Sequence, residues 1–293
     1  MGRPDALHEL VARSADRAKQ SAAIRQGELA VTYAELQALA VQLAAELACA
    51  GVGEERVVAL DLPSSPRMIA AMLAAGILGA AFLPLDRRDT PERRAALVAD
   101  AGAVAVVTEY ALHTTDADTR LEGRPAYLTY RAGVTARLRP MVAGQRAAVD
   151  HIENAVAEYR LRPSDRQLQL ASPALEFAIE EIFSTLTASA TLVLPDAEFG
   201  YEDVVSLLRL VDERGGTILT LPTSVHDAFG RELRRSPHLL LPRALRLVAV
   251  GRQAAAADAR AAWHAAAREA TFRVVRAVGP ASAPRKRPVS LTS

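Results

Sequence analysis

The sequence lacks the residues that would mark a disulfide-stabilised or metal-binding protein. Cys49 is its single cysteine among 293 residues, so no disulfide can form within the chain, and a reducing compartment is expected. Cys49 lies in an alanine- and leucine-rich stretch, which predicts a small buried side chain rather than a nucleophile. The six histidines are scattered and show no metal-ligand spacing. We therefore expect neither a disulfide framework nor a metal site.

Net charge and long apolar runs are also scarce. A formal charge of +1 gives no reason to expect a polyanionic partner, so we predict no nucleic-acid binding. The longest apolar run, Met68–Pro84, is interrupted by Gly76 and Gly79, which argues against a membrane span. The N-terminus does not show the basic-then-apolar layout of a signal peptide. The sequence predicts a cytoplasmic protein without a membrane partner.

What the chain does contain is a regular alternation of apolar strands and amphipathic helices. Half of the residues are hydrophobic, enough for a sizeable core at this length. Thr32 and Glu35 form a predicted capping box that opens a helix ending near Gly51. Strands are predicted at Val57–Leu62, Ala80–Leu85 and Ala103–Thr108, and helices at Pro66–Leu78 and Pro91–Asp100. Alternation at this pace predicts a parallel sheet with helices on both faces.

A second series of strands and helices follows residue 140. Strands are predicted at Gln167–Leu170, Ala190–Leu194, Thr217–Leu221, Leu245–Val250 and Phe272–Val278, and helices at Gln145–Tyr159, Leu175–Leu186, Tyr201–Arg214, Pro222–Arg234 and Ala254–Glu269. Leu175 is expected to begin the buried stripe of its helix. The fold class is therefore α/β, with two stacked, mainly parallel α/β subdomains at residues 1–140 and 141–280. Residues 281–293 show no periodicity and are predicted to be a disordered tail.

The two series meet at a basic loop. A short strand at Ala126–Tyr130 is followed by small residues and by Arg131, Arg137 and Arg139. Backbone N–H groups and a cation in such a loop can hold phosphate oxygens. Taken alone, the local sequence favours a basic surface turn between two elements.

Three segments before this loop resemble the adenylation domains of nonribosomal peptide synthetases. Val31–Leu36 is similar to the family's Leu-Thr-Tyr-x-Glu-Leu. Gly76–Asp86 is similar to Leu-Lys-Ala-Gly-x-Ala-Tyr-x-Pro-Leu-Asp, and Thr90–Arg93 to Pro-x-Glu-Arg. The resemblance implies the N-terminal core of an adenylate-forming enzyme, with the C-terminal subdomain absent from this chain.

The loop itself resembles the family's Tyr-Thr-Ser-Gly-Ser-Thr-Gly-x-Pro-Lys-Gly, which handles the ATP phosphates. The chain retains Tyr130, Gly133 and Thr135 and has Arg139 in place of the lysine. Ala132 and Val134 replace its two serines. The resemblance implies a nucleotide-binding loop that has lost much of its chemistry.

A later segment, Leu175–Phe183, is similar to Phe-Asp-x-Ser-Val-x-Glu-Ile-Phe, whose aspartate holds the amine of an amino acid in the family. Glu176 takes that position, with Phe177 and Glu180 as neighbours. A solvated acid at a helix N-terminus is the alternative for Glu176. The resemblance implies a substrate-pocket remnant formed by Glu176, Phe177, Glu180, Thr220, Val248, Val250 and Ala277.

Two further nucleotide motifs are altered. Val248–Ala254 resembles Val-Val-Gly-Gly-Glu-Ala and keeps Gly251, but has Arg252 and Gln253 in place of the second glycine and the acid. The family's aromatic-Gly-Pro-Thr-Glu appears as Val278–Ser282 and keeps Gly279 and Pro280. Valine offers no stacking surface for adenine, and serine offers no carboxylate for magnesium.

These losses favour a catalytically inactive adenylation-domain homologue without cofactor or metal, acting as a scaffold or interaction element in nonribosomal peptide biosynthesis. Its expected partner is an assembly-line synthetase, through a condensation or carrier domain, or a second copy of the chain. One alternative is an ATP- and magnesium-dependent acid-adenylating enzyme completed by another polypeptide. Another is a small-molecule-binding protein that uses a cleft near Glu176, Thr220 and Val250. A fragmentary or frameshifted reading frame is a further alternative.

Overall fold

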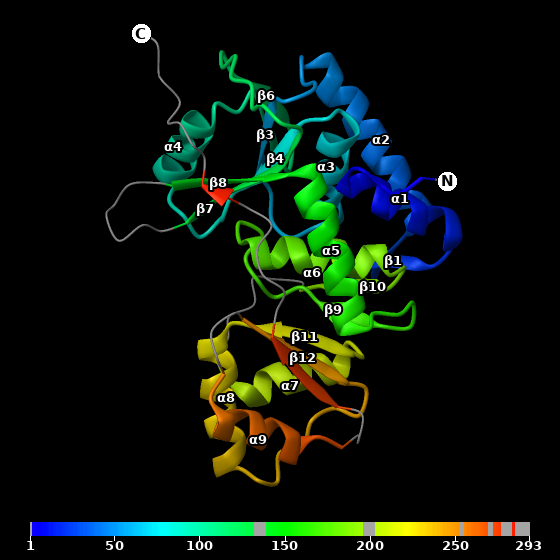
Figure 1. The fold of residues 1–293 in the computed structure, drawn as a ribbon, viewed down its shortest axis with the longest axis vertical. Helices are drawn as coiled ribbons and strands as arrows, with labels where there is room; N and C mark the ends of the chain where they lie inside the picture. Colours follow the sequence, from blue (N-terminus) through cyan, green and yellow to red (C-terminus); the bar gives the residue numbers. More distant parts are fainter. Residues whose placement is uncertain are drawn as a thin grey trace.

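Two β-sheets with helices packed against them form the chain (Figure 1). The computed structural model describes residues 2–131, 139–195, 203–251, 255–268, 272–276 and 283–284. Its helices are α1 Leu7–Arg17, α2 Tyr33–Cys49, α3 Pro66–Ile77, α4 Pro91–Ala101, α5 Gln145–Tyr159, α6 Glu176–Thr187, α7 Val204–Glu213, α8 Thr223–Arg235 and α9 Ala257–Ala266. Its strands are β1 Ala22–Gln26, β2 Leu29–Thr32, β3 Val57–Asp61, β4 Ala81–Pro84, β5 Ala105–Thr108, β6 Leu112–Thr114, β7 Pro125–Arg131, β8 Arg139–Gly144, β9 Arg166–Leu168, β10 Thr191–Leu194, β11 Ile218–Leu221, β12 Leu247–Val250, β13 Arg273–Arg276 and β14 Ala283–Pro284.

The first sheet has the strand order β14-β8-β7-β4-β3-β5-β6. Its central strands β7, β4, β3 and β5 are parallel, whereas β6 and β8 pair antiparallel with their neighbours at the two margins. All four residues of β4 and the first four of β3 are buried. Because both faces of these strands are covered, they are apolar almost without interruption.

The second sheet has the order β13-β12-β11-β9-β10-β1-β2. Every neighbouring pair is parallel except β1 and β2, which form an antiparallel hairpin at the margin. The prediction of an α/β protein with two mainly parallel sheets is therefore confirmed. The antiparallel strand pairs at the margins were not predicted. The prediction relied on strands alternating with helices, whereas the two strands of a hairpin are adjacent in sequence with no helix between them.

The sheets exchange segments across the predicted boundary at residue 140. The β1–β2 hairpin comes from the N-terminal part of the chain, yet β1 pairs with β10 in the second sheet. In the opposite direction, β14 pairs with β8 in the first sheet, with Ala283 opposite Val142. Those two residues lie within the stretch expected to be disordered; the rest of 281–293 lies outside the described residues. The division into domains at residue 140 remains a prediction.

Several helix boundaries follow from local chemistry. The capping box is confirmed: the Thr32 hydroxyl accepts from the Glu35 backbone N–H, and the Glu35 carboxylate accepts from the Thr32 backbone N–H at 2.8 Å. Ser65 and Thr90 cap α3 and α4, each followed by a proline in the first turn. At the other end of α4, Gly102 takes a left-handed conformation with φ of 62°.

Two burial predictions are wrong. Cys49 is exposed, because α2 lies at the margin of the molecule and packs through Leu36, Leu43 and Leu47 on its other side (Figure 1). Leu175 is 49% exposed, because it is the N-cap residue that precedes α6 rather than part of its buried stripe. Ile179, further along the helix, is buried as expected.

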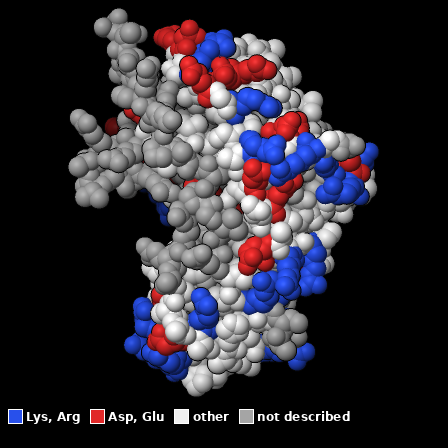
Figure 2. Space-filling view, viewed as in Figure 1, with Lys and Arg blue, Asp and Glu red and all other residues white. Residues whose placement is uncertain are grey.

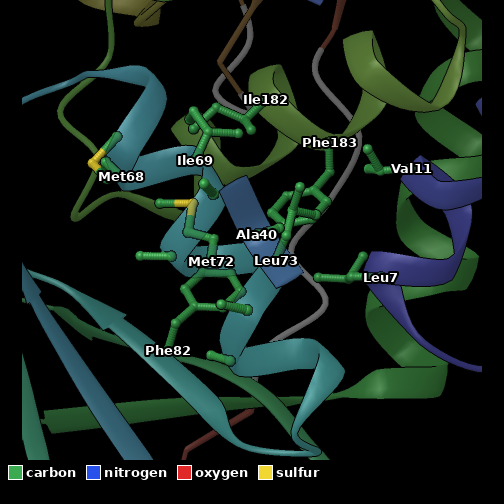
Figure 3. Close-up of a cluster of buried hydrophobic side chains, with 14 of the residues drawn as sticks. Leu7, Val11, Ala40, Met68, Ile69, Met72, Leu73, Phe82, Ile182 and Phe183 are labelled. Carbon is green, nitrogen blue, oxygen red and sulfur yellow. The ribbon is translucent and has the colours of Figure 1, made fainter. Parts of the chain in front are cut away.

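The main core lies between the sheets and joins them. Figure 3 shows Leu7 and Val11 of α1, Met72 and Leu73 of α3, Phe82 of β4 and Phe183 of α6 directed toward one another. The Phe82 and Phe183 rings stack with centroids 5.9 Å apart. A second cluster, around Trp263, fills the space between the second sheet and α7, α8 and α9. Both faces of the second sheet are thus covered.

The long apolar run of the sequence is explained by this core. Every residue from Met68 to Gly76 in α3 is buried, and β4 follows directly in the sheet interior. An interior helix is apolar on all sides because it has no solvent-facing stripe. Among the helices described, none has the length and apolar character needed to cross a membrane.

Candidate functional site

The basic loop connects two antiparallel strands. β7 ends at Arg131, which pairs with Arg139 at the start of β8. Gly133, Thr135 and Arg137 lie between them, outside the described residues. β8 was not predicted, and it separates the loop from the N-terminus of α5. Of the motif residues, Tyr130 is placed with its side chain: its hydroxyl donates to Oδ2 of Asp100 in α4 at 2.6 Å.

Glu176 opens α6 and faces the first sheet. Its Oε1 accepts a hydrogen bond from the Tyr127 hydroxyl at 2.9 Å. Tyr127 is 1% exposed, and burial, followed by the nearby charge of Glu176, raises the pKa of its hydroxyl well above the usual value. Glu176 is half-buried and hydrogen-bonded, so it is not simply a solvated N-terminal acid.

Glu180 lies one turn further along α6 and is buried, with 3% exposure. The Tyr159 hydroxyl donates to its Oε1, and Nε2 of His151 lies 2.9 Å from its Oε2. Both partners come from α5, which packs along α6 (Figure 1). The sequence suggested neither of them, because Tyr159 fits the apolar stripe of α5 and an isolated histidine carries no spacing signal. Glu180 is thus committed to an interhelical network.

Glu181, the next residue, is buried on the side of α6 that faces the second sheet. Its Oε2 is 3.5 Å from Nε2 of Gln169, and Thr220 also hydrogen-bonds to the carboxyl group. Burial raises the pKa of Glu181 to about 8, although hydrogen bonds from the Ala171 backbone, Gln169 and Thr220 oppose that rise. The carboxyl group is therefore protonated at neutral pH, which avoids a buried charge.

The hydrogen-bond network around Glu181 continues along the second sheet. Gln167 of β9 donates from Nε2 to the Thr220 hydroxyl at 2.8 Å, and its Oε1 accepts from the Thr185 hydroxyl at 2.8 Å. Thr220 is 1% exposed. Its hydroxyl is consequently satisfied within the protein, beneath α6.

Val248 and Val250 lie on the other face of the sheet from Thr220. In the register of β11 and β12, Thr220 is opposite Ala249, so successive residues alternate between the two faces. Val248 and Val250 belong to the cluster around Trp263, with 0% and 2% exposure. The structure therefore does not bring Val250 and Thr220 together in one cleft. Ala277, the last member of the predicted pocket, lies outside the described residues.

Gly251 directly follows β12 and makes close contacts with neighbouring segments. Its N–H donates to the Leu221 carbonyl at 2.9 Å, and its carbonyl accepts from the Thr223 hydroxyl at 3.0 Å. A Cβ atom here would lie 3.1 Å from that hydroxyl oxygen, so glycine suits the position sterically. Gly279 and Pro280 lie outside the described residues.

Asp86 links the first sheet to α6. It follows β4, and its Oδ2 accepts from the Ser172 hydroxyl at 2.7 Å, just before the helix. Hydrogen bonds from Arg88 and then from Ser172 lower the pKa of Asp86 to about 2, although burial opposes the shift. Asp86 therefore ties down the segment that leads to Glu176.

Phe177 follows Glu176 and is half-buried. The first turns of α6 thus hold Glu176, Phe177 and Glu180 together, whereas Thr220 lies beneath α6, and Val248 and Val250 lie behind the sheet. In the described part of the chain, no three histidine, cysteine, aspartate or glutamate side chains are grouped to hold a metal ion.

The sequence of the chain was compared with family models and with known proteins. Residues 11–126 match a family model described as AMP-binding enzyme. An isonitrile lipopeptide synthase of Streptomyces coeruleorubidus is 30% identical over 314 aligned residues, which cover 96% of this chain and 21% of that protein. The malpinin synthetase of Mortierella alpina is 31% identical over 232 aligned residues, covering 71% of this chain and 3% of the relative. The chain thus spans a small part of these relatives.

Solved structures show the same fold. The N-terminal subdomain of NpsA from Klebsiella oxytoca, bound to anthranilyl-AMSN, matches with a TM-score of 0.77 and 17% identity, over 98% of this chain and 79% of that one. The nonribosomal peptide synthetase FmoA3 in its AMPPNP-bound form matches with a TM-score of 0.80 and 22% identity, over 98% of this chain and 34% of that one.

Proposed function

We propose that this chain, which belongs to the AMP-binding enzyme family and corresponds to the N-terminal part of a nonribosomal peptide synthetase adenylation domain, is a non-catalytic scaffold or interaction element in nonribosomal peptide biosynthesis. The observation that carries the proposal is the loss of chemistry at several separate family positions together. A single loss would be tolerable, since acyl-adenylate formation depends on many positioned charges and donors.

The phosphate loop provides the first support. Ala132 and Val134 have no hydroxyl groups, and Val134 adds a branched side chain. Arg139 keeps a positive charge, but its planar fork is not equivalent to the compact ammonium of lysine. The degenerate nucleotide site, in this proposal, consists of Tyr130, Gly133, Thr135, Arg139, Gly251, Gly279 and Pro280.

The positions that contact adenine and magnesium in the family provide the second support. Val278 replaces a stacking aromatic residue, Ser282 replaces the acid associated with the metal, and Arg252 replaces a glycine where the nucleotide approaches the backbone. Removing one preorganised contact to a transition state typically lowers the rate by about 10²–10³. Several losses together would bring acid activation to background, so these residues do not fit a site that uses ATP as substrate and magnesium as cofactor.

The contacts of the two pocket acids support the proposal independently. The Tyr127 hydroxyl donates to Glu176, and the Tyr159 hydroxyl donates to Glu180, which also contacts His151. These partners tie both acids to the surrounding structure and restrict their use for a substrate ammonium group. In this proposal, Glu180 serves the packing of α5 against α6 and Glu176 the contact between β7 and α6, rather than turnover.

The proposal includes a protein partner and a cytoplasmic location. The curated relatives are much longer synthetases, which supports association with an assembly line. We expect the partner, or a second copy of the chain, to bind through the face around Leu245–Val278. The single cysteine supports a reducing compartment. Light scattering that shows a monomer at high concentration, together with no binding of purified condensation or carrier domains, would contradict this part.

An active enzyme remains the alternative, because the fold of the N-terminal core is retained. In that case, another polypeptide would complete the site and Arg139 would act in place of lysine, with ATP as co-substrate and Mg²⁺ as cofactor. A binding protein that retains the remnant near Glu176 and Phe177 is the third candidate. The separation of Thr220 from Val250 by the sheet argues against the wider cleft that such a protein needs.

Isothermal titration calorimetry separates the three. For a scaffold we expect no saturable heat with Mg-ATP up to about 1 mM, the upper end of common substrate affinities. A variant with the family loop restored, Ala132→Ser, Val134→Ser and Arg139→Lys, is the matched comparison. Saturable ATP binding by the unaltered chain would favour the enzyme. Saturable binding of an amino or aryl acid without ATP would favour the binding protein.

A further inference from the structure

Helix α4 lies against the first sheet (Figure 1), and a pocket of about 420 Å³ opens to the surface between them. Small-molecule sites in proteins typically have volumes of about 300–1,000 Å³, apolar walls and a few polar groups. The polar side chains at this pocket are Asp61, Arg94 and Thr115. Its apolar wall includes Leu85, Ala95, Val98, Ala99, Ala103 and Val106. These residues are separate from the candidate site, so the inference does not depend on whether the chain is catalytic.

Small side chains on α4 leave the space that forms the pocket. The helix packs into the sheet through Leu97 and Ala101, which are buried. Ala95 and Ala99 lie one turn apart on a neighbouring face of the helix, and their side chains reach no further than Cβ. Val106 of β5, which also lines the pocket, is half-buried. A regular helix and a regular strand therefore provide the walls, and the pocket is formed before any ligand binds.

Asp61 and Arg94 form an ion pair at the pocket. Nε of Arg94 donates to Oδ2 of Asp61 at 3.2 Å, and Nη1 of Arg94 donates to the Asp89 carbonyl at 2.6 Å. Oδ1 of Asp61 is buried and has no hydrogen-bond partner in the part of the chain that the structure describes. The Thr115 hydroxyl is satisfied, since it donates to the Ala103 carbonyl at 2.6 Å. An unsatisfied carboxylate oxygen is costly, so a donor from a ligand would stabilise this end of the pocket.

The charges at the pocket are balanced, which selects against charged ligands. The side chains of Arg94 and Asp61 are 18% and 23% exposed, and each pairs with the other. A ligand carboxylate would be repelled by Asp61, and a ligand ammonium group by Arg94. Over the upper half of the molecule, where Figure 1 places the first sheet, Figure 2 shows acidic and basic side chains next to one another. The surroundings therefore favour neither sign of charge, and an uncharged ligand fits best.

We propose that this pocket binds a small apolar molecule that carries one uncharged hydroxyl group, such as an alkylphenol. The apolar body lies against the wall that includes Val98 and Val106, and the hydroxyl group donates to Oδ1 of Asp61. The terminal torsion of an aspartate side chain is broad, so Oδ1 can turn toward the ligand while Oδ2 stays near Arg94. An apolar cavity of about 150 Å³ can hold a benzene ring. At about 420 Å³, this pocket has room for a substituted ring.

The test follows the methyl NMR signals of Ala95, Ala99 and Val106 while 4-methylphenol is added to the full chain. Toluene lacks the hydroxyl group, and 4-methylbenzoate and 4-methylbenzylamine carry a negative and a positive charge. We expect saturable shifts of these signals with 4-methylphenol. Its affinity should be at least about tenfold higher than that of each of the other three, because a hydrogen bond to a carboxylate is among the stronger ones. Absence of saturable shifts, or tighter binding of a charged analogue, would overturn the proposal.

Three variants locate the binding and identify its polar contact. Ala99→Phe fills the pocket from an exposed position of α4 and should weaken 4-methylphenol binding at least about tenfold. Ala96→Phe, also exposed on α4 but outside the pocket wall, is the matched control and should stay within about twofold of the parent. Asp61→Leu/Arg94→Leu removes both charges together, so no unpaired charge remains. It should bind 4-methylphenol and toluene about equally well.

Circular dichroism verifies that each variant is folded. Equal loss of 4-methylphenol binding in Ala99→Phe and Ala96→Phe would place the ligand elsewhere and overturn the proposal. A preference for 4-methylphenol over toluene that persists in Asp61→Leu/Arg94→Leu would also overturn it, because the hydroxyl group would then have another partner.

Discussion

Replacing Arg246 by alanine should destabilise the protein strongly. Its Nε and Nη2 donate to the two carboxylate oxygens of Asp165 at 2.8 and 2.5 Å, and its Nη atoms also reach the carbonyls of Tyr159 and Arg160 at 3.3 and 3.0 Å. Asp165 is 2% exposed and accepts further from the Thr217 hydroxyl at 3.0 Å. The pair therefore joins the end of α5 to the beginnings of β9, β11 and β12.

The size of this loss in unfolding free energy follows from the burial of the ion pair. Removing one partner of a buried ion pair leaves the other charge uncompensated and typically costs about 3–5 kcal/mol of unfolding free energy. Urea denaturation of the Arg246→Ala variant should show a loss in that range. Arg246→Lys, which keeps the charge but lacks the fork, should lose less. The double variant Asp165→Asn/Arg246→Met should lose less than the sum of its single changes, because no unpaired charge remains. A loss below about 1 kcal/mol for Arg246→Ala, or strict additivity, would refute this reasoning.

Two further predictions concern α6 and α8. The pKa of Glu181 is about 8 in the folded protein against 4.5 ordinarily, so the folded state holds an extra proton between these values and stability should fall as pH rises through that window, by up to about 1.4 kcal/mol per pH unit. Glu181→Gln should abolish that fall in the melting temperature; an unchanged pH profile would contradict the assignment. Gly230→Ala should lower the unfolding free energy by about 1–3 kcal/mol, because the new Cβ would lie 2.6 Å from the Ala259 Cβ across α8 and α9. Gly53→Ala, with no atom within 4 Å of its Cβ, is the control and should unfold nearly as the parent does.

The parts of the fold that the sequence predicted are those set by short-range patterns. Thr32 and Glu35 are three residues apart, and their capping box formed as expected. The apolar runs of β3 and β4 indicated strands covered on both faces. The hairpins were missed because β8 begins with Arg139 and Pro140, which read as a continuation of the basic loop. Pairing of Arg139 with Arg131 across seven intervening residues depends on the sheet, not on local propensity.

The candidate site was harder to predict because its contacts are long-range. The register that sets Thr220 opposite Ala249, and so separates it from Val248 and Val250, is fixed by tertiary packing. Likewise, Tyr127 meets Glu176 only when the first sheet packs against α6. The resemblance to the family's motif identified Glu176 as a candidate, but its partner lies 49 positions away along the chain.

The most direct test of the central claim is ATP–pyrophosphate exchange by the purified chain. The assay supplies Mg-ATP, labelled pyrophosphate and, in turn, a panel of amino and aryl acids, with an active adenylation domain as the positive control. Exchange reports reversible formation of an acyl-adenylate, which is the step that the altered positions Ala132, Val134, Val278 and Ser282 should prevent. We predict exchange at the level of the no-enzyme background for every acid. Acid-dependent exchange with any one of them would contradict the non-catalytic role and establish the chain as an enzyme.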